Sequence, residues 1–173
     1  QNPRASRYRE LCGVLRWIET CTRPDISATL GELSKFQINP GEDHIRRLEH
    51  LMRYVSTTRH HCLHYGASKK NTANGLLVGY MDSDWAGDKD TFASRGGWIF
   101  TSWQTPISWS SFKLRAVAAS SCESEYMSAS VGVREARWLR YLISDLGYGD
   151  VSCKEFGNLC DQDFARVQLG DLM

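Results

Sequence analysis

Residues 76–88 read LLVGYMDSDWAGD, an apolar run that passes directly into a cluster of aspartates. Leucine, valine and tyrosine favour a strand over 76–81, and the acids and glycine that follow mark its end. Two more runs, at 96–102 and 106–110, are rich in tryptophan and β-branched residues. Neighbouring strands of this kind predict a sheet that begins near residue 76.

A long helix is predicted after these strands, from Glu123 to Asp145, with Gly147 as its stop. Weaker strands are predicted at 62–65, 117–121 and 151–160, the last one interrupted by Gly157 and Asn158. Consecutive strands followed by a β-α-β order indicate an α/β fold, in which a mixed sheet carries packed helices.

The segment before the sheet has a helical rather than a strand-like pattern of apolar residues. Apolar residues at helical spacing predict three short helices within residues 8–57. Thr22 is expected to cap the second helix, and Pro24 suits its first turn. The chain therefore reads as a helical segment followed by a sheet-containing domain.

Composition excludes several classes of protein. The 173 residues are 42% hydrophobic and 24% charged, which argues against wholesale disorder and fibrous repeats. No run approaches 18 apolar residues, so no membrane span is expected. The first residues lack an apolar signal core, which favours an intracellular site. The six cysteines and five histidines show no zinc-ligand spacing, so we expect free thiols.

Charge is unevenly distributed along the chain. Residues 1–70 hold 12 Lys/Arg and 7 Asp/Glu, a balance of +5, whereas residues 71–173 hold 9 and 13, a balance of −4. A basic half can bind a polyanion and an acidic half can hold metal ions. Charge alone favours ordinary surface variation, so the positions of the acids carry the argument.

The acids gather where predicted elements begin or end, so that side chains from separate segments can converge. Converging carboxylates repel one another unless a divalent cation lies between them, and all-oxygen ligation suits Mg²⁺ or Mn²⁺. A pair of such ions is the usual device for phosphodiester hydrolysis. Each acid taken singly also fits an ordinary turn or helix end. The set comprises Asp82, Asp84, Asp88, Asp90, Glu123, Glu125, Asp161 and Asp163.

The two glutamates of the long helix face different ways. Residues two apart on a helix are separated by about 200°, so only one of Glu123 and Glu125 can face the sheet. The heptad series from Glu125 is Gly132, Leu139, Leu146, whereas that from Glu123 is Ser130, Arg137, Ser144. Glu125 is therefore expected to point inward, where a carboxylate needs a partner or a metal.

Several motifs together resemble one family. They are YMDSDWAGD at 80–88, PISWSS at 106–111, SSCESEY at 120–126 and EARWL at 135–139, preceded by YRELCG at 8–13, TRPDI at 22–26 and RYV at 53–55. This series resembles the ribonuclease H domain of Ty1/copia-type retrotransposon Pol polyproteins, together with the segment that joins it to reverse transcriptase. The resemblance covers nearly the whole chain in the right order.

The resemblance implies a ribonuclease H fold over 61–173, with a five-stranded mixed sheet and flanking helices, and a helical connection over 1–60. It implies cleavage of the RNA strand of RNA–DNA hybrids with two Mg²⁺ or Mn²⁺ ions. The partners would be the hybrid and the reverse transcriptase domain of the same polyprotein, with no membrane. The setting would be intracellular, in a cytoplasmic particle or the nucleus.

Asp82, Glu125 and Asp161 match the family's catalytic, metal-binding acids. Asp84 and Glu123 lie next to these acids in sequence and are expected to support them or to be solvated. Phosphate contacts are expected from Lys69, Lys70, Lys113 and Arg115, and Trp85 is the tryptophan best placed to stack on nucleic acid. Each of these lysines and arginines, taken alone, is more commonly a solvated surface residue than a phosphate contact.

Two departures keep an alternative open. The family usually reads KSTSG before its second strand and CDNQSA around its third acid, where this chain has FASRG at 92–96 and CDQDFA at 160–165. The chain ends at Met173, before the expected last helix and fourth metal ligand, so a fragment or a degenerate copy is expected. The alternative function is a non-catalytic remnant that binds nucleic acid or reverse transcriptase.

Overall fold

The computed structural model describes residues 3–65, 77–88, 91–102, 105–148 and 156–158. The chain divides into two compact units, Gln1–His64 and Tyr65–Met173, which we call the helical unit and the sheet unit. Within the described ranges, no helix is long and apolar enough to cross a membrane.

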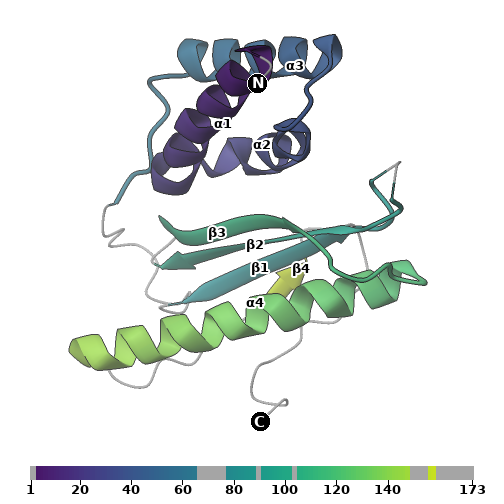
Figure 1. Cartoon of the computed structure of the whole chain (residues 1–173). Coiled ribbons are helices and arrows are strands. Elements are labelled where there is room, and N and C mark those ends of the chain that lie inside the picture. The colour runs from purple at the N-terminus through teal and green to yellow at the C-terminus, as the bar shows by residue number, and fades with distance from the viewer. Residues whose placement is uncertain (1–2, 66–76, 89–90, 103–104, 149–155, 159–173) are drawn as a thin grey trace. The chain divides into compact units, whose positions relative to one another are not determined.

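The helical unit holds the three helices that the apolar spacing predicts (Figure 1). Helix α1 spans Pro3–Thr22, α2 spans Ser27–Leu33 and α3 spans Glu42–Thr57, and 3-10 turns at Pro24–Ile26 and Ser34–Phe36 flank α2. Burial of the inward side chains gives the unit its own apolar core. This core consists of Tyr8, Cys12, Leu15, Ile26, Leu30, Leu33, Leu48 and Leu51.

The prediction that Thr22 caps the second helix is wrong. Thr22 belongs to the last turn of α1, where its hydroxyl donates to the carbonyl of Ile18 at 3.4 Å. Arg23 is the N-cap residue instead, and Pro24 follows in the first turn as predicted. Proline suits this position because it lacks the N–H that would have no partner there.

Arg23 ties the start of α2 to the end of α3. Only 5% of the residue is exposed. Its guanidinium donates to both carboxylate oxygens of Asp25 at 2.9 and 2.7 Å, and to the carbonyl and hydroxyl of Thr58 at 3.2 and 2.7 Å. Tyr54 completes the cluster by donating to Asp25 at 2.9 Å. The buried cation is thus compensated by a carboxylate and by further hydrogen bonds.

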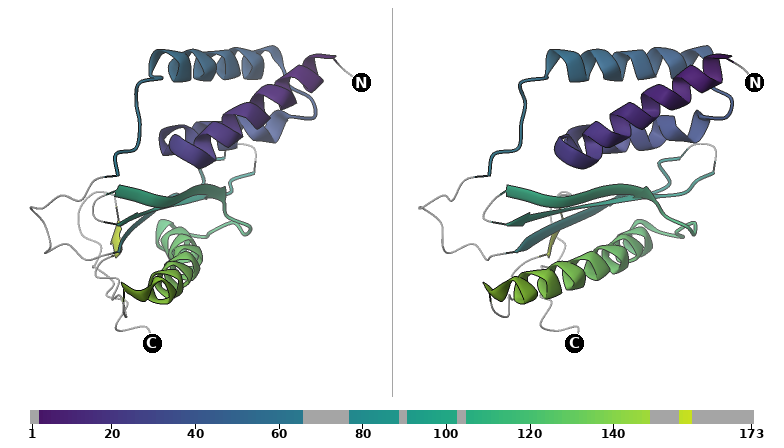
Figure 2. Two further views of the ribbon diagram at one scale, coloured as in Figure 1. Left: turned by 90° about the vertical axis from the view of Figure 1, so that its left-hand side faces the viewer. Right: turned by 60° about the vertical axis from the view of Figure 1, so that its left-hand side comes forward.

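The described residues of the sheet unit form three long antiparallel strands and one short parallel strand. Strands β1 (Val78–Asp84), β2 (Arg95–Ser102) and β3 (Thr105–Lys113) pair in sequence, and β4 (Phe156–Asn158) pairs parallel with β1. The order within the described residues is β3-β2-β1-β4. Helix α4, Ser121–Ile143, lies along one face of this sheet (Figures 1 and 2).

Small residues bring α4 close to the sheet. A Cβ added at Gly132 would overlap the sulfur of Met81 on β1, so any larger residue would force the Met81 side chain to shift. Ser124, Ser128 and Ala136 are buried on the same helix face. The apolar core beside them is formed by Leu77, Met81, Phe100, Ala136 and Leu139.

The mixed α/β architecture is confirmed, but the described residues hold four strands rather than the five expected. Residues 62–65 form no strand; of residues 117–121, the first four form a loop and Ser121 is the first residue of α4. The second error has a clear cause, because the hydroxyl of Ser120 accepts from the N–H of Glu123 and begins the helix there. Gly157 and Asn158 do not interrupt a strand; their backbones pair with Tyr80 and Met81.

Candidate functional site

Asp82 and Glu125 meet at the backbone N–H of Ser83. This N–H donates to Asp82 Oδ1 at 2.9 Å and to Glu125 Oε1 at 3.3 Å. Asp82 comes from the end of β1 and Glu125 from the first turns of α4, so two elements distant in sequence bring their carboxylates to one donor. The structure therefore places together two of the three acids that the sequence singles out.

Strand alternation explains why a serine lies between the two acids. Met81 and Ser83 face α4, since Met81 packs against Gly132 and Ser83 Oγ lies 2.7 Å from Ser124 Oγ. Asp82 and Asp84 consequently project from the other side of β1. The Asp82 carboxylate reaches the Ser83 N–H, and the Glu125 carboxylate reaches the same group from the helix.

The helix-face argument for Glu125 agrees with the burial along α4. Gly132 and Leu139 in its heptad series are buried, whereas Ser130 and Arg137 in the Glu123 series are exposed. Leu146 departs from the argument because it lies beyond the end of α4, in a turn over Ser144–Tyr148, and is 65% exposed. Gly147 takes a positive φ of 86° in that turn, close to its expected role as the stop.

Burial raises the pKa of the Glu125 carboxyl above its ordinary value, and the neighbouring Asp82 charge raises it further. Hydrogen bonds from the side chain and backbone of Ser83 act in the opposite direction. The balance disfavours the ionised form. A carboxylate in such surroundings gains from a nearby positive charge.

Three serines that the sequence analysis did not single out hold β1 against α4. The hydroxyls of Ser83 and Ser124 are 2.7 Å apart, and Ser128 Oγ donates to the backbone carbonyl of Asp82 at 3.0 Å. Ser124 and Ser128 are 0% and 1% exposed. The sequence does contain one sign of this role. Ser124 and Ser128 are four residues apart and so share a face of the helix that carries Glu125.

Glu123 and Asp84 have partners away from the two-carboxylate site. Glu123 Oε2 accepts from the N–H of Ala119 at 2.6 Å, in a reciprocal cap with Ser120 at the start of α4. The Asp84 carboxylate packs over Gly87, where a Cβ would overlap it. Glu123 thus has a helix-capping contact, and Asp84 a contact with the loop that follows β1.

Trp85 is half exposed at the end of β1 and is held at one edge. Its indole N–H donates to the carbonyl of Ala118 at 3.1 Å, just before α4. The next residue, Ala86, has a φ of 53°, and its N–H donates to Ser94 Oγ at 3.1 Å. The exposed part of the indole is therefore carried by a braced loop that begins where β1 ends, three residues after Asp82 in the chain.

The other expected site residues have different surroundings. Lys113 Nζ donates to Asp88 at 3.1 Å and to Thr91 at 2.8 Å, so its charge is already paired. Arg115 is exposed beyond the end of β3. Asp161, Lys69 and Lys70 lie outside the described residues.

The Asp82–Glu125 pair fits a divalent cation by its chemistry. Both side chains offer carboxylate oxygens, the ligands that Mg²⁺ and Mn²⁺ prefer, and their mutual repulsion is relieved by a positive charge between them. No group of three or more Asp, Glu, His or Cys side chains suited to a metal occurs among the described residues. A third ligand would have to come from elsewhere, and Asp161 is the acid expected from the sequence.

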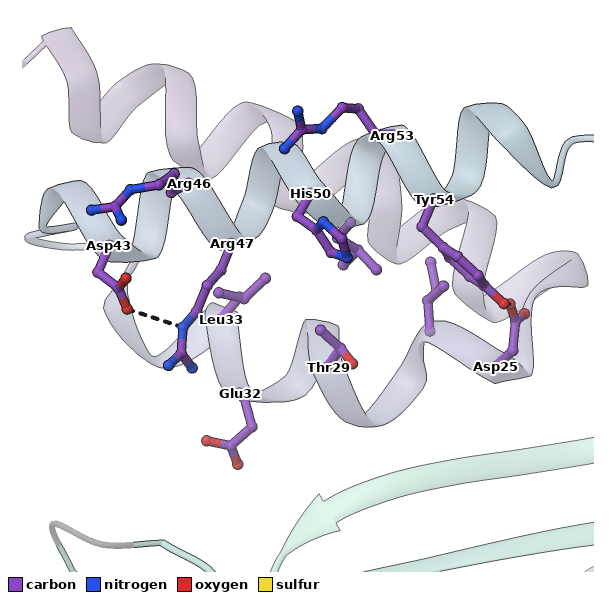
Figure 3. Close-up of a pocket in the computed structure, with 12 residues that line it drawn as sticks. Asp25, Thr29, Glu32, Leu33, Asp43, Arg46, Arg47, His50, Arg53 and Tyr54 are labelled. Atoms are coloured by element: carbon purple, nitrogen blue, oxygen red, sulfur yellow. Dashed lines mark hydrogen bonds and ion pairs between the residues drawn. The ribbon is translucent and has the colours of Figure 1, made fainter.

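The helical unit contains a groove of about 660 Å³ between α2 and α3 (Figure 3). Arg47, His50 and Tyr54 point into it from α3, and Arg53 points away from α2. Its charged groups are partly neutralised within the unit, because Asp43 pairs with Arg47 at 3.0 Å and Asp25 with Arg23 at 2.7 Å. The groove belongs to the other unit from Asp82 and Glu125, and its residues suggest no reaction.

Polyproteins from plant transposons are similar to most of the chain. "Retrovirus-related Pol polyprotein from transposon RE1" of Arabidopsis thaliana is 39% identical over 142 residues, covering 82% of this chain and 9% of the polyprotein. The corresponding polyprotein from transposon TNT 1-94 of Nicotiana tabacum is 36% identical over 158 residues, covering 91% and 11%. The chain therefore spans about a tenth of the length of these polyproteins.

A relative of another kind is similar over almost its whole length. "Secreted RxLR effector protein 161" of Plasmopara viticola is 39% identical over 132 residues, which cover 76% of this chain and 90% of that protein. No protein-family model matches the chain, and no solved structure matches it. Several relatives at 36–39% identity over most of the chain carry the polyprotein name, and the chain accordingly belongs to the retrovirus-related Pol polyproteins of copia-type transposons.

Proposed function

We propose that this chain provides a ribonuclease H activity of a copia-type Pol polyprotein, hydrolysing the RNA strand of RNA–DNA hybrids. The observation that carries the proposal is the meeting of the Asp82 and Glu125 carboxylates at the Ser83 N–H. Carboxylates converging from a strand end and a helix are the ligands that metal-dependent phosphodiester hydrolysis requires. The polyprotein relatives support a role in a retrotransposon.

Asp82, Glu125 and Asp161 would hold two Mg²⁺ or Mn²⁺ ions. Bound in this way, the ions supply an activated water and stabilise the 3′ leaving oxygen. The chain's own contribution would be to hold two carboxylates near each other, with the Ser83 N–H donating to both. Trp85, half exposed just after β1, would stack on the substrate strand.

The proposed substrate is a hybrid recognised by shape, phosphates and 2′-hydroxyls rather than by base sequence. Arg115, Lys69 and Lys70 are the proposed phosphate contacts, and Lys113 would have to leave Asp88 to join them. The proposed protein partner is the reverse transcriptase domain of the same polyprotein. The proposed setting is intracellular, in a cytoplasmic particle or the nucleus.

The direct test is to incubate the purified full chain with a labelled RNA–DNA hybrid and Mn²⁺, beside Glu125→Gln. Cleavage of the RNA strand is expected from the chain and not from the variant, because glutamine removes the charge and keeps the size. Ser130→Ala, an exposed change on α4, is the matched control and should cleave normally. Cleavage of equal rate in Glu125→Gln would contradict the proposal.

One observation favours a second candidate, a non-catalytic binding module. The effector relative is covered over 90% of its length and is not named as a polyprotein. A folded chain that binds the hybrid, or a reverse transcriptase domain, without cleaving RNA would establish this alternative. In that case Asp82→Asn and Glu125→Gln would leave binding unchanged.

A further inference from the structure

We propose that Ser83 and Ser124 are positioning residues that fix the separation of the Asp82 and Glu125 carboxylates for a divalent cation. The inference rests on the proposed function, because it assigns a role in cation binding at the same site. Neither serine contacts the cation in this role. Each acts by holding the backbone or helix turn that carries a carboxylate.

Ser83 and Ser124 join the end of β1 to the first turn of α4. Ser124 Oγ donates to the backbone carbonyl of Ser121 at 2.8 Å and lies 2.7 Å from Ser83 Oγ. A hydroxyl group both donates and accepts, so this contact joins the two elements whichever serine gives the proton.

Ser83 makes three contacts through two of its atoms, the backbone nitrogen and the hydroxyl oxygen. Its N–H reaches both carboxylates, and its hydroxyl reaches the helix. Ser124 is fully buried, so if the Ser83 hydroxyl were removed, water could not take its place beside Ser124 without a rearrangement. One helical turn later, Ser128 makes a second tie to the carbonyl of Asp82. β1 and α4 cannot slide past each other without breaking these bonds.

Such a restraint matters because the two carboxylates repel each other. Without it, the carboxylates would move apart, and a cation would have to draw them together on binding. Ligands held at the right separation bind a metal more tightly than ligands that must first be gathered. The Ser83–Ser124 contact supplies this restraint from the side of the carboxylates that faces the core.

The test is Mn²⁺ binding to the full chain, measured by calorimetry. Ser83→Ala keeps the N–H and removes only the hydroxyl, and its Mn²⁺ affinity is expected to fall about 10-fold or more. Ser124→Ala should show a loss of similar size. Ser83→Thr restores a hydroxyl on a residue that suits a strand, so it should recover the affinity of the unmodified chain.

Ser130→Ala is a matched control on the same helix. Its hydroxyl also bonds the carbonyl three residues earlier, that of Met127 at 2.8 Å, but it is exposed and has no contact with β1 among the described residues. Its Mn²⁺ affinity should not change. Far-ultraviolet circular dichroism checks that each variant is folded. If Ser124→Ala, a change at a buried residue, does not fold, the Mn²⁺ affinity of Ser83→Ala alone tests the positioning role.

The outcomes separate this inference from the proposed function. Equal Mn²⁺ affinities in Ser83→Ala and the unmodified chain would overturn the positioning role, and so would an unmodified chain that binds no Mn²⁺. Mn²⁺ binding without hybrid cleavage would overturn the ribonuclease proposal alone. The serine affinities would then still decide the positioning role.

Discussion

Two carboxylates, one in each unit, have opposite surroundings. Asp25 of the helical unit accepts bonds from Arg23 and Tyr54, and these hold its pKa below the ordinary value although burial acts the other way. Glu125 of the sheet unit has its pKa raised by burial and by Asp82, against the bonds from Ser83. Among the described residues, the groups acting on the pKa of Glu125 include no cationic side chain.

The difference separates a structural acid from a candidate functional one. Asp25 is neutralised by a partner from its own unit, so its charge contributes to stability. Glu125 lies where its charge is disfavoured, a situation that stability alone does not select and that is concentrated at functional sites. Removing a charge partner of Asp25 should therefore lower the stability of the chain. Neutralising Glu125 should raise the stability and weaken the response to a divalent cation.

The largest effect is expected from Arg23→Ala in the helical cluster. The change removes the bonds to Asp25 and Thr58 and leaves their acceptors without the guanidinium. The free energy of unfolding should fall by about 1.5–3 kcal/mol, the range for hydrogen bonds to charged groups. Urea denaturation followed by circular dichroism measures it, and a loss no greater than that of Arg46→Ala, an exposed residue of α3, would contradict the prediction.

A pair of glycine substitutions compares helix packing in the two units. Gly132→Ala would place a methyl group against Met81 and should destabilise the chain by about 1–3 kcal/mol, the usual range for overpacking. Gly13→Ala lies on α1 with nothing within 4 Å and should stabilise by up to about 1 kcal/mol through helix propensity. Thermal unfolding of both variants checks the sign, and a stabilising Gly132→Ala would show that α4 is not held close to β1.

The sequence was sufficient for elements with strong local signals. The apolar spacing of residues 8–57 predicts the three helices, and β-branched and aromatic runs predict β2 and β3. Strand predictions at 62–65 and 117–121 failed because short apolar runs carry no information on pairing partners. Ser120 shows the competing signal, since its capping bond turns the second run into the start of a helix.

The sequence could single out Asp82 and Glu125, the two acids that meet at the Ser83 N–H, but not the serines that hold β1 against α4. Glu125 could be assigned to the sheet side because a helix has a fixed period, and Asp82 because it follows a strong strand. The role of Ser83 depends on which face of β1 meets α4, a fact of tertiary packing. Its contact with Ser124 joins residues 41 positions apart, so no local pattern could reveal it.

Glu125→Gln sharpens the comparison from the sheet unit. Because the pKa of Glu125 is raised, its ionised form is disfavoured near neutral pH, and a neutral isostere should raise the midpoint of thermal unfolding in the absence of divalent cations. The same variant should lose the stabilisation that Mn²⁺ gives the unmodified chain. Thermal melts with and without Mn²⁺ measure both; an unchanged Mn²⁺ response in the variant would remove Glu125 from the proposed cation site.

The smallest expected effect is the loss of unfolding free energy at low pH that we assign to Asp25. Its pKa in the folded chain lies below the ordinary value of 3.8, chiefly because Arg23 donates to the ionised carboxylate. The stabilisation is therefore fully present above pH 3.8 and is lost as the pH falls through the lower folded-state pKa. Asp25→Asn should be less stable than the unmodified chain at pH 5, and the gap should narrow toward pH 2. Urea midpoints across this range test the sign; a gap that widened on acidification would mean that Arg23 does not favour the ionised form.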